Sequence, residues 1–600
     1  MKNAFVIVTL SGLLAACATP PVPGDLSDVL PRAAEPLALV QPAGTADDDD
    51  SDADNDPSQN LPKVALTPDL LFRLMKAELE YKEGQWQGPY VTMMSAAQQT
   101  RDPRLARRAA EMALSIKRND EAQAALALWR ELAPDSDDAF QYYMGLAVLT
   151  DRLDEAESLF RRRLQDAAPA TRPMVMFQVQ QFMTRAKDRE QGARAIERLL
   201  APYGDTVEAH VVLAQIAAGR GAADVAQAEA RRALAIKPDS EIAVLTLAQV
   251  LTDQQEIDST LARFVARNPA AREARVAYAR VLVGAKRYAD ARKQFEVLLK
   301  ESPDDLNTLY ALGVTAMQMG DNGGAEQHFQ RFLTTLEKDP DDERDPGKVL
   351  MVLAQLAETR GDLAAASELL DRIAGDDGDT WFSAQLKRAQ LMAKGGDFDG
   401  AQRFLAELKP EEPSSQAQVL MVRAQTLRDA GRAAEAYALM GEGAQRFPAN
   451  TELLYDYALM AEKLGHLNVM ETTLRRVMAQ SPDNHHAYNA LGYSLADRNE
   501  RLPEARTLIA KALEMAPHDP FIMDSMGWVE YRLGNLDAAE QHLRRAYELR
   551  NDVEIAVHLG EVLWKKGMKA DAQKLLRQAH AKDPKNDALK NTLSRLQVNL

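Results

Sequence analysis

Few residues in this chain are spaced so that they could do chemistry together. The sequence has no G-x-S-x-G elbow, no G-x-x-x-x-G-K-[ST] phosphate loop, no H-E-x-x-H and no C-x-x-C. Most of the histidines follow residue 460, but no two of them have the i, i+3 or i+4 spacing that places two metal ligands on one helix face. We therefore expect no catalytic residue, no metal site and no cofactor. These histidines are expected on the surface or on the walls of a groove: His466, His485, His486, His518, His542, His558 and His580.

The single cysteine, Cys17, follows a short apolar segment at the start of the chain. Lys2 provides a positive charge, and residues 4–14 form an apolar run too short to span a bilayer, which needs about 20 residues. The four residues Leu14-Ala15-Ala16-Cys17 resemble the bacterial lipobox. We expect a signal peptide over residues 1–16, cleavage between Ala16 and Cys17, and lipid attachment at Cys17. The alternative is an ordinary signal peptide with an incidental cysteine.

The residue after the cysteine bears on localisation. Ala18 rather than an aspartate follows Cys17, and in the sorting rule of enteric bacteria this sends a lipoprotein to the outer membrane. We expect the protein on the periplasmic face of that membrane, which it contacts only through its N-terminal lipid, because several acyl chains on one residue anchor firmly.

Residues 17–62 are rich in proline, alanine and aspartate. Like charges repel and prolines stiffen a chain, so we expect a disordered, solvated tether here. The alternating Asp50, Asp52, Asp54 and Asp56 raise the alternative of a calcium loop, but the glycine and distal glutamate of an EF-hand are not in register.

The charge balance excludes one class of partner. The chain has 89 acidic and 72 basic residues, a net charge of −17, and no basic stripe. Since lysine and arginine supply most of the affinity for phosphate backbones, we expect no nucleic-acid binding.

From about Thr67 onward the sequence repeats with a period of roughly 34 residues. Gly492, Gly527 and Gly560 recur once in each period, and alanines and helix-ending prolines recur at similar intervals. Small residues at these positions let two helices cross closely, and proline marks the turn into the next repeat. The pattern predicts an all-α, superhelical tetratricopeptide-repeat solenoid of about fifteen helix pairs. The further recurring residues are Ala505, Ala539, Ala572; Ala512, Ala546, Ala579; Pro448, Pro482, Pro517; and, stepping upstream, Ala458, Ala424, Ala389, Ala354, Gly313, Ala279, Ala248, Ala214, Val179, Gly145, Ala110 and Ala77.

Two steps break this rhythm. An acidic insertion, residues 337–347, lengthens the step from Gly313 to Ala354, and the step from Ala248 to Ala279 is shorter than the others. Because each repeat of a solenoid contacts only its neighbours, such steps weaken one interface. We predict two arrays, residues 63–336 and 348–600, with residues 250–350 either a hinge or a harmless loop insertion.

The first helix of each repeat lines the concave wall of such a solenoid. Counting from the small residue of the last three repeats places aromatic, amide and carboxylate side chains on this wall, which suits peptide binding. Packing between repeats is an equal alternative for the tryptophans. The predicted partner-binding groove consists of Asn489, Tyr493, Asp524, Trp528, Tyr531, Glu561 and Trp564.

The stretch from Asn484 to about Gly567, with NALGYSLADRNERLPEA and DSMGWVEYRLGNLDAAEQHLRRAYELRNDVEIAVHLGEVLWKKG, resembles the LbcA-type family of outer-membrane tetratricopeptide-repeat lipoproteins. The resemblance implies a non-enzymatic adaptor that binds periplasmic proteins, namely a carboxyl-terminal processing protease and its cell-wall hydrolase substrates. Alternatives are an assembly lipoprotein of a pilus, secretion or polysaccharide-export machine, and a scaffold for peptidoglycan enzymes.

Overall fold

The computed structural model describes residue 62 and residues 64–339, 342, 344–375 and 378–598. Over these residues the chain forms 31 α-helices, one short 3-10 helix and no strand, which confirms the predicted all-α class. None of the described helices is both long and apolar enough to cross a membrane. The predicted signal peptide, Ala16, Cys17 and all of the tether but residue 62 lie outside the described residues.

The chain divides into two compact units, with the boundary between Thr335 and Leu336. The first unit contains α1 (Pro68–Lys82), α2 (Gln87–Thr100), α3 (Pro103–Ser115), α4 (Asn119–Leu132), α5 (Asp137–Leu149), α6 (Leu153–Asp166), α7 (Arg172–Met183), α8 (Arg189–Leu200), the 3-10 helix η3 (Ala201–Tyr203), α9 (Val207–Gly219), α10 (Ala223–Ile236), α11 (Glu241–Val250), α12 (Gln254–Arg267), α13 (Arg272–Gly284), α14 (Tyr288–Glu301), α15 (Leu306–Gln318) and nearly all of α16 (Asn322–Leu336).

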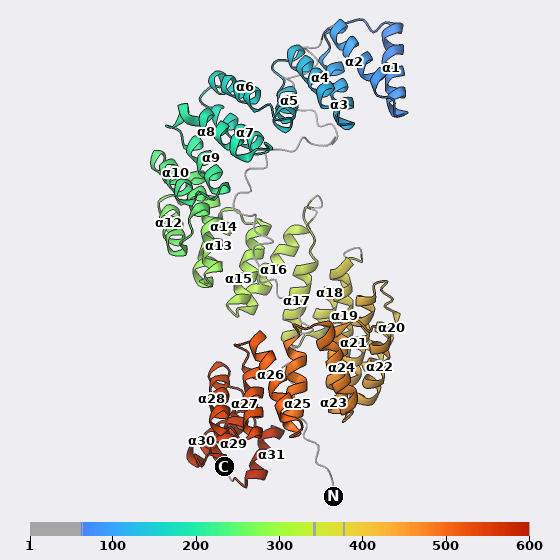
Figure 1. The fold of residues 1–600 in the computed structure, drawn as a ribbon, viewed down its shortest axis with the longest axis vertical. Helices are drawn as coiled ribbons and strands as arrows, with labels where there is room; N and C mark the ends of the chain where they lie inside the picture. The colour runs from blue at the N-terminus through green and yellow to red at the C-terminus, as the bar shows by residue number, and fades with distance from the viewer. Residues whose placement is uncertain (1–61, 63, 340–341, 343, 376–377, 599–600) are drawn as a thin grey trace. The chain divides into compact units, whose positions relative to one another are not determined.

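The second unit contains α17 (Gly347–Thr359), α18 (Leu363–Asp371), α19 (Gly378–Lys394), α20 (Phe398–Glu407), α21 (Pro413–Asp429), α22 (Ala433–Arg446), α23 (Thr451–Lys463), α24 (Leu467–Gln480), α25 (His485–Asp497), α26 (Leu502–Met515), α27 (Pro520–Leu533), α28 (Leu536–Leu549), α29 (Val553–Lys565), α30 (Lys569–Lys582) and α31 (Asp587–Leu596). Within each unit, successive helices pack side by side in pairs (Figure 1).

Local sequence signals set where these helices begin and end. In α27, the carboxylate of Asp519 accepts hydrogen bonds from the backbone N–H groups of Phe521 and Ile522, and Pro520 stands at the first helical position, where its missing N–H costs nothing. The helix ends at Gly534, whose φ of 89° is the left-handed conformation that favours glycine. Pro448, Pro482 and Pro517 each lie in the turn between one repeat and the next, as predicted.

The small residues of the repeat lie where two helices cross closely. A Cβ added to Gly527 would lie 2.5 Å from Cγ of Leu543 and 3.1 Å from the carbonyl oxygen of Ala539, and one added to Gly313 would lie 2.6 Å from Phe329. Of the predicted contact positions in the first helices, only Gly145 and Ala248 are half-buried; the others are buried. The structure thus confirms the steric reason for the period.

The shorter of the two irregular steps has a local explanation. Helix α11 stops at Val250 because Leu251 is extended, and the buried side chains of α12 are Leu261, Phe264 and Val265, with no alanine among them, unlike those of α10 and α14. Large side chains replace the small-residue contact, so the spacing there follows different packing. Whether residues 250–350 act as a hinge between two arrays remains a prediction.

Candidate functional site

The last repeats place the predicted groove residues around a buried charged centre. Asp524 lies on α27 and His558 on α29, one repeat later, and each is 7% exposed. Nδ1 of His558 lies 2.9 Å from both carboxylate oxygens of Asp524 and donates to them, since a carboxylate only accepts. The indole of Trp528 stacks on the imidazole, with ring centroids 4.3 Å apart and planes 24° apart. His558 is therefore buried, and its expected place on the surface or on a groove wall was wrong.

The charge of His558 follows from its neighbours. Burial by itself lowers its pKa, but the charge and hydrogen bond of Asp524, aided by Glu554 and Glu561, raise the pKa of His558 to about 9. At neutral pH the ring is an imidazolium, and the face of Trp528 adds a cation–π contact. The pKa of Glu554 is also raised, to about 7. For this carboxyl group burial raises the pKa, and the charge of His558 opposes the rise.

A second buried carboxylate joins α29 to its neighbours. Glu561 is 3% exposed, and it accepts a hydrogen bond of 2.9 Å from the hydroxyl of Tyr531 on α27 and bonds from Arg595 and Thr592 on α31. Burial, with the charge of Glu561, raises the pKa of Tyr531 to about 12. Because both carboxylates have partners on neighbouring helices, the centre fastens α27, α29 and α31 together.

The predicted groove residues fall into two groups. Asp524, Trp528 and Glu561 are buried between repeats, whereas Asn489, Tyr493, Tyr531 and Trp564 are half-buried. The burial of Trp528 favours the packing alternative for this residue. That the half-buried members bind a partner remains a prediction.

Two polar atoms of this set have no hydrogen-bond partner within the described residues. They are Oδ1 of Asn489, on α25, and Nε1 of Trp528, on α27, and both atoms are buried. A buried donor or acceptor without a partner costs about 1–3 kcal/mol, so such a group calls for an explanation.

His558, Thr592 and Arg595 were not among the predicted site residues. A signal for His558 was only partly present: it lies about one repeat after Asp524, but it stands two residues before Gly560, whereas Asp524 stands three before Gly527, so the two positions differ by one residue. The contribution of α31 had no such signal, because the repeat count was made on the small residues of the preceding repeats and did not reach this helix.

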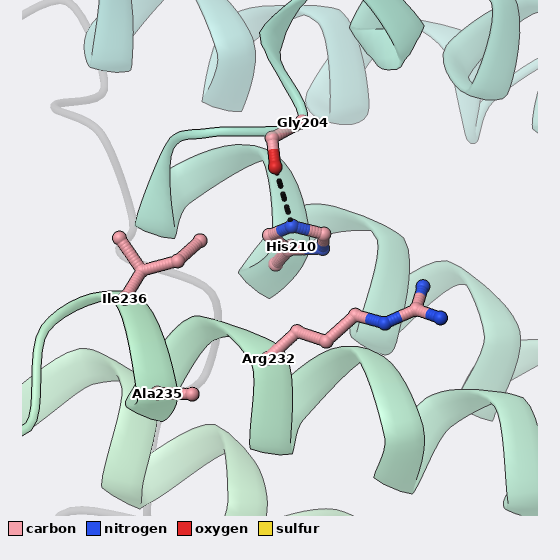
Figure 2. A pocket seen from close by; sticks show the side chains of 5 residues that line it. All are labelled: Gly204, His210, Arg232, Ala235 and Ile236. Carbon is pink, nitrogen blue, oxygen red and sulfur yellow. Dashed lines mark hydrogen bonds between the residues drawn. The ribbon is translucent and has the colours of Figure 1, made fainter.

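A shallow depression of about 490 Å³ lies in the first unit, lined by Gly204, His210, Arg232, Ala235 and Ile236 (Figure 2). Nε2 of His210 lies 2.9 Å from the carbonyl oxygen of Gly204, and its Nδ1 lies 2.5 Å from Glu229 on α10. Arg232 donates to the same glutamate at 2.6 Å. Both ring nitrogens are engaged, so His210 ties the turn after η3 to α9 and α10, and we assign it no chemistry.

Among the described residues, no group of three or more histidine, cysteine, aspartate or glutamate side chains is arranged to hold a metal ion.

Four stretches of the chain match the tetratricopeptide repeat family: residues 246–305, 310–380, 467–520 and 525–588. Together these stretches make up less than half of the chain, and over them the chain is similar to tetratricopeptide repeats. It is also similar to a tetratricopeptide-repeat-containing protein of Pseudomonas aeruginosa, 40% identical over 209 residues. That match covers 35% of this chain and 35% of the relative, so the chain matches about a third of the relative's length.

Solved structures with similar helix arrangements are MamA of Desulfovibrio magneticus, a thermophilic tetratricopeptide-repeat protein of Thermus thermophilus, and the APC/C hetero-tetramer Cut9–Hcn1. Their identities are 19%, 25% and 13%, and their TM-scores 0.25, 0.28 and 0.32. The matches cover 28%, 30% and 82% of this chain, and 93%, 100% and 95% of the other chains. Tetratricopeptide repeats make protein–protein interaction scaffolds, and this is the general class of function that the chain supports.

Proposed function

We propose that this chain is a non-enzymatic adaptor, anchored to the outer membrane through lipidated Cys17, that recruits a carboxyl-terminal processing protease and its cell-wall hydrolase substrates. The scaffold class rests on the repeats. The identity of the partner and the anchor rest on the lipobox and on the resemblance of the C-terminal repeats to the LbcA-type lipoproteins.

One observation carries the choice of the binding wall. Asn489 and Trp528, on neighbouring first helices, each hold a buried polar atom without a partner among the described residues, next to the half-buried rings of Tyr493 and Tyr531. A partner's main-chain N–H can satisfy Oδ1 of Asn489 once the Asn489 amide turns outward. The rings supply flat contact area beside them.

Affinity capture of the lipidated protein from detergent-solubilised envelopes, followed by a degradation assay with purified components, tests the proposal. We expect the processing protease among the captured proteins, and faster degradation of a cell-wall hydrolase when this chain is added. Cys17→Ser serves as the unanchored control. This variant should be absent from the membrane fraction, and the helix content of its repeats should be unchanged. If no processing protease is captured, or its activity does not respond, the adaptor role is wrong.

The Asn489→Ala variant tests the wall itself. It removes a buried acceptor without a partner, so we expect unchanged or slightly higher stability together with at least a tenfold loss of captured protease, measured by binding titration. Asn591→Ala on the exposed face of α31 is the matched control and should bind normally. Normal binding by Asn489→Ala would exclude this wall.

A further inference from the structure

Helix α1, the first of the repeats, is apolar on two faces. Its inner face packs into the core through Leu70, Leu74, Ala77 and Tyr81. Its outer face, which we call the α1 end face, consists of Leu71, Phe72, Met75 and Leu79, whose exposed fractions are 43%, 66%, 57% and 60%. At 3.6 residues per turn these four side chains share a stripe about 100° wide. A helix that is apolar on both faces is normally covered on both.

Interior first helices have such cover. In α29 every residue from Ile555 to Leu563 is buried, because the repeats before and after it enclose the helix. The last helix, α31, is covered on one side only, and its outer side is polar: Lys590, Asn591, Ser594 and Arg595 are exposed, while Leu589 and Thr592 are buried. A solenoid normally ends in a polar face of this kind. The α1 end face departs from that rule.

We propose that the α1 end face binds the same face of a second copy of this chain, with the two α1 helices antiparallel about a twofold axis at Met75. Three of its four members are symmetric about this residue, because Leu71 and Leu79 stand one helical turn on either side of it; the counterpart of Phe72 is Glu78. A self-complementary patch is what a twofold interface requires. In the antiparallel pair, Leu71 of one copy contacts Leu79 of the other, and the two Met75 side chains meet.

The polar flank of α1 permits this pairing. Arg73 pairs with Asp69 at 3.0 Å and Lys76 with Glu80 at 3.6 Å, so the flank carries no net charge that would repel a copy. Antiparallel helices also oppose their dipoles favourably.

The area is sufficient for a weak interface. Side chains of this size and exposure present on the order of 100 Å² each, so the four residues of the two copies bury roughly 800 Å² in total, which is the range of weak interfaces. We therefore expect a dissociation constant on the order of 10 µM.

Sedimentation equilibrium of the full chain tests the proposal, in a Cys17→Ser background that has neither the lipidated residue nor any other thiol. Met75→Arg and Met75→Glu each place like charges opposite each other at the twofold axis. Each variant alone should weaken the dimer by roughly 100-fold or more, since juxtaposed like charges cost several kcal/mol. An equal mixture of the two variants should restore a dimer, because the guanidinium introduced in one copy then faces the carboxylate introduced in the other.

Val225→Arg, on α10, is the matched control, because Val225 is 53% exposed and lies away from α1. It should dimerise like the parent. A parent chain that stays monomeric at a concentration on the order of 100 µM, well above the expected dissociation constant, would overturn the proposal. So would a Met75→Arg chain that still dimerises, or a mixture that fails to restore the dimer. Dimerisation only after deletion of residues 18–60 would show that the chain's own N-terminal segment occupies the face, and would also overturn it.

Discussion

The first and last repeats of this chain follow the same sequence pattern but are held together differently. Helices α3 and α4 pack through alanines, among them Ala109, Ala113 and Ala122, with Arg107 over the ring of Trp129 at 5.6 Å near the surface. Helices α27, α29 and α31 are joined in addition by buried charged groups centred on His558 and Glu561. The repeat pattern therefore specifies the close helix crossing, while the remaining positions decide whether buried charged groups are added to the apolar packing.

The first and last repeats also differ in the polarity of their outer faces. The last repeat is closed by the polar α31, and the first ends in an apolar face. We therefore expect the stability of the last repeats to depend on pH, and we expect the first repeat to take part in self-association.

The largest expected effect is on the unfolding free energy, and it distinguishes the two tryptophans of the last repeats. Trp528→Ala removes a 3% exposed indole stacked on His558, so we expect a loss of about 3–5 kcal/mol in the unfolding free energy of the C-terminal unit. Trp564 is half-buried beneath the ammonium of Lys569 at 5.1 Å, so Trp564→Ala should cost only about 1–2 kcal/mol. Guanidinium unfolding followed by circular dichroism measures both, and equal losses would contradict the distinction drawn between the two residues.

The next effect concerns pH. The folded pKa values of His558, about 9, and Glu554, about 7, both lie above their ordinary values, so the folded state binds protons more tightly than the unfolded chain. The contribution of His558 is then fully present below pH 6.5 and is lost as the pH rises through 9, while that of Glu554 is lost between about pH 4.5 and 7. We expect His558 alone to account for a loss on the order of 2–3 kcal/mol in the C-terminal unit between pH 6 and 9, measured by calorimetric melting.

Asp524→Asn is the variant that sharpens this prediction. It removes the main group that raises the pKa of His558, so the variant should be less stable at pH 6 and should show a much flatter pH dependence. Asp571→Asn, at an exposed position on α30, should retain the parent profile. An unchanged slope in Asp524→Asn would mean that His558 is not the group responsible.

The smallest effect compares two glycines of the repeat register. Gly527→Ala pushes a methyl group to 2.5 Å from Leu543, and we expect a net loss of about 1–2 kcal/mol. Around Gly145 the nearest atom to an added Cβ is Phe182 Cε1 at 3.8 Å, so Gly145→Ala should gain about 0.5–1 kcal/mol from the higher helix propensity of alanine. Unfolding midpoints with the same sign of change would contradict the steric account.

The helix pairs could be predicted because the close crossing of two helices requires a small residue at a recurring position of the sequence. A side chain larger than a methyl group clashes at positions such as Ala458 and Gly492, so small residues recur once per repeat and can be counted. The groove could be predicted only in part. A period assigns Asp524 and Trp528 to the same side of a helix as Tyr531, but it does not tell how far the next repeat covers each of them.

The sequence by itself determined the all-α class, the repeat period and the number of helix pairs, because these depend on local helix signals and on one steric rule applied many times. Only the tertiary structure decided that His558 is buried against Asp524, that Glu561 reaches Arg595 on α31, and that the outer face of α1 is exposed among the described residues. Each of these depends on which side chains of neighbouring repeats come within contact distance, and burial and charge pairing arise only there.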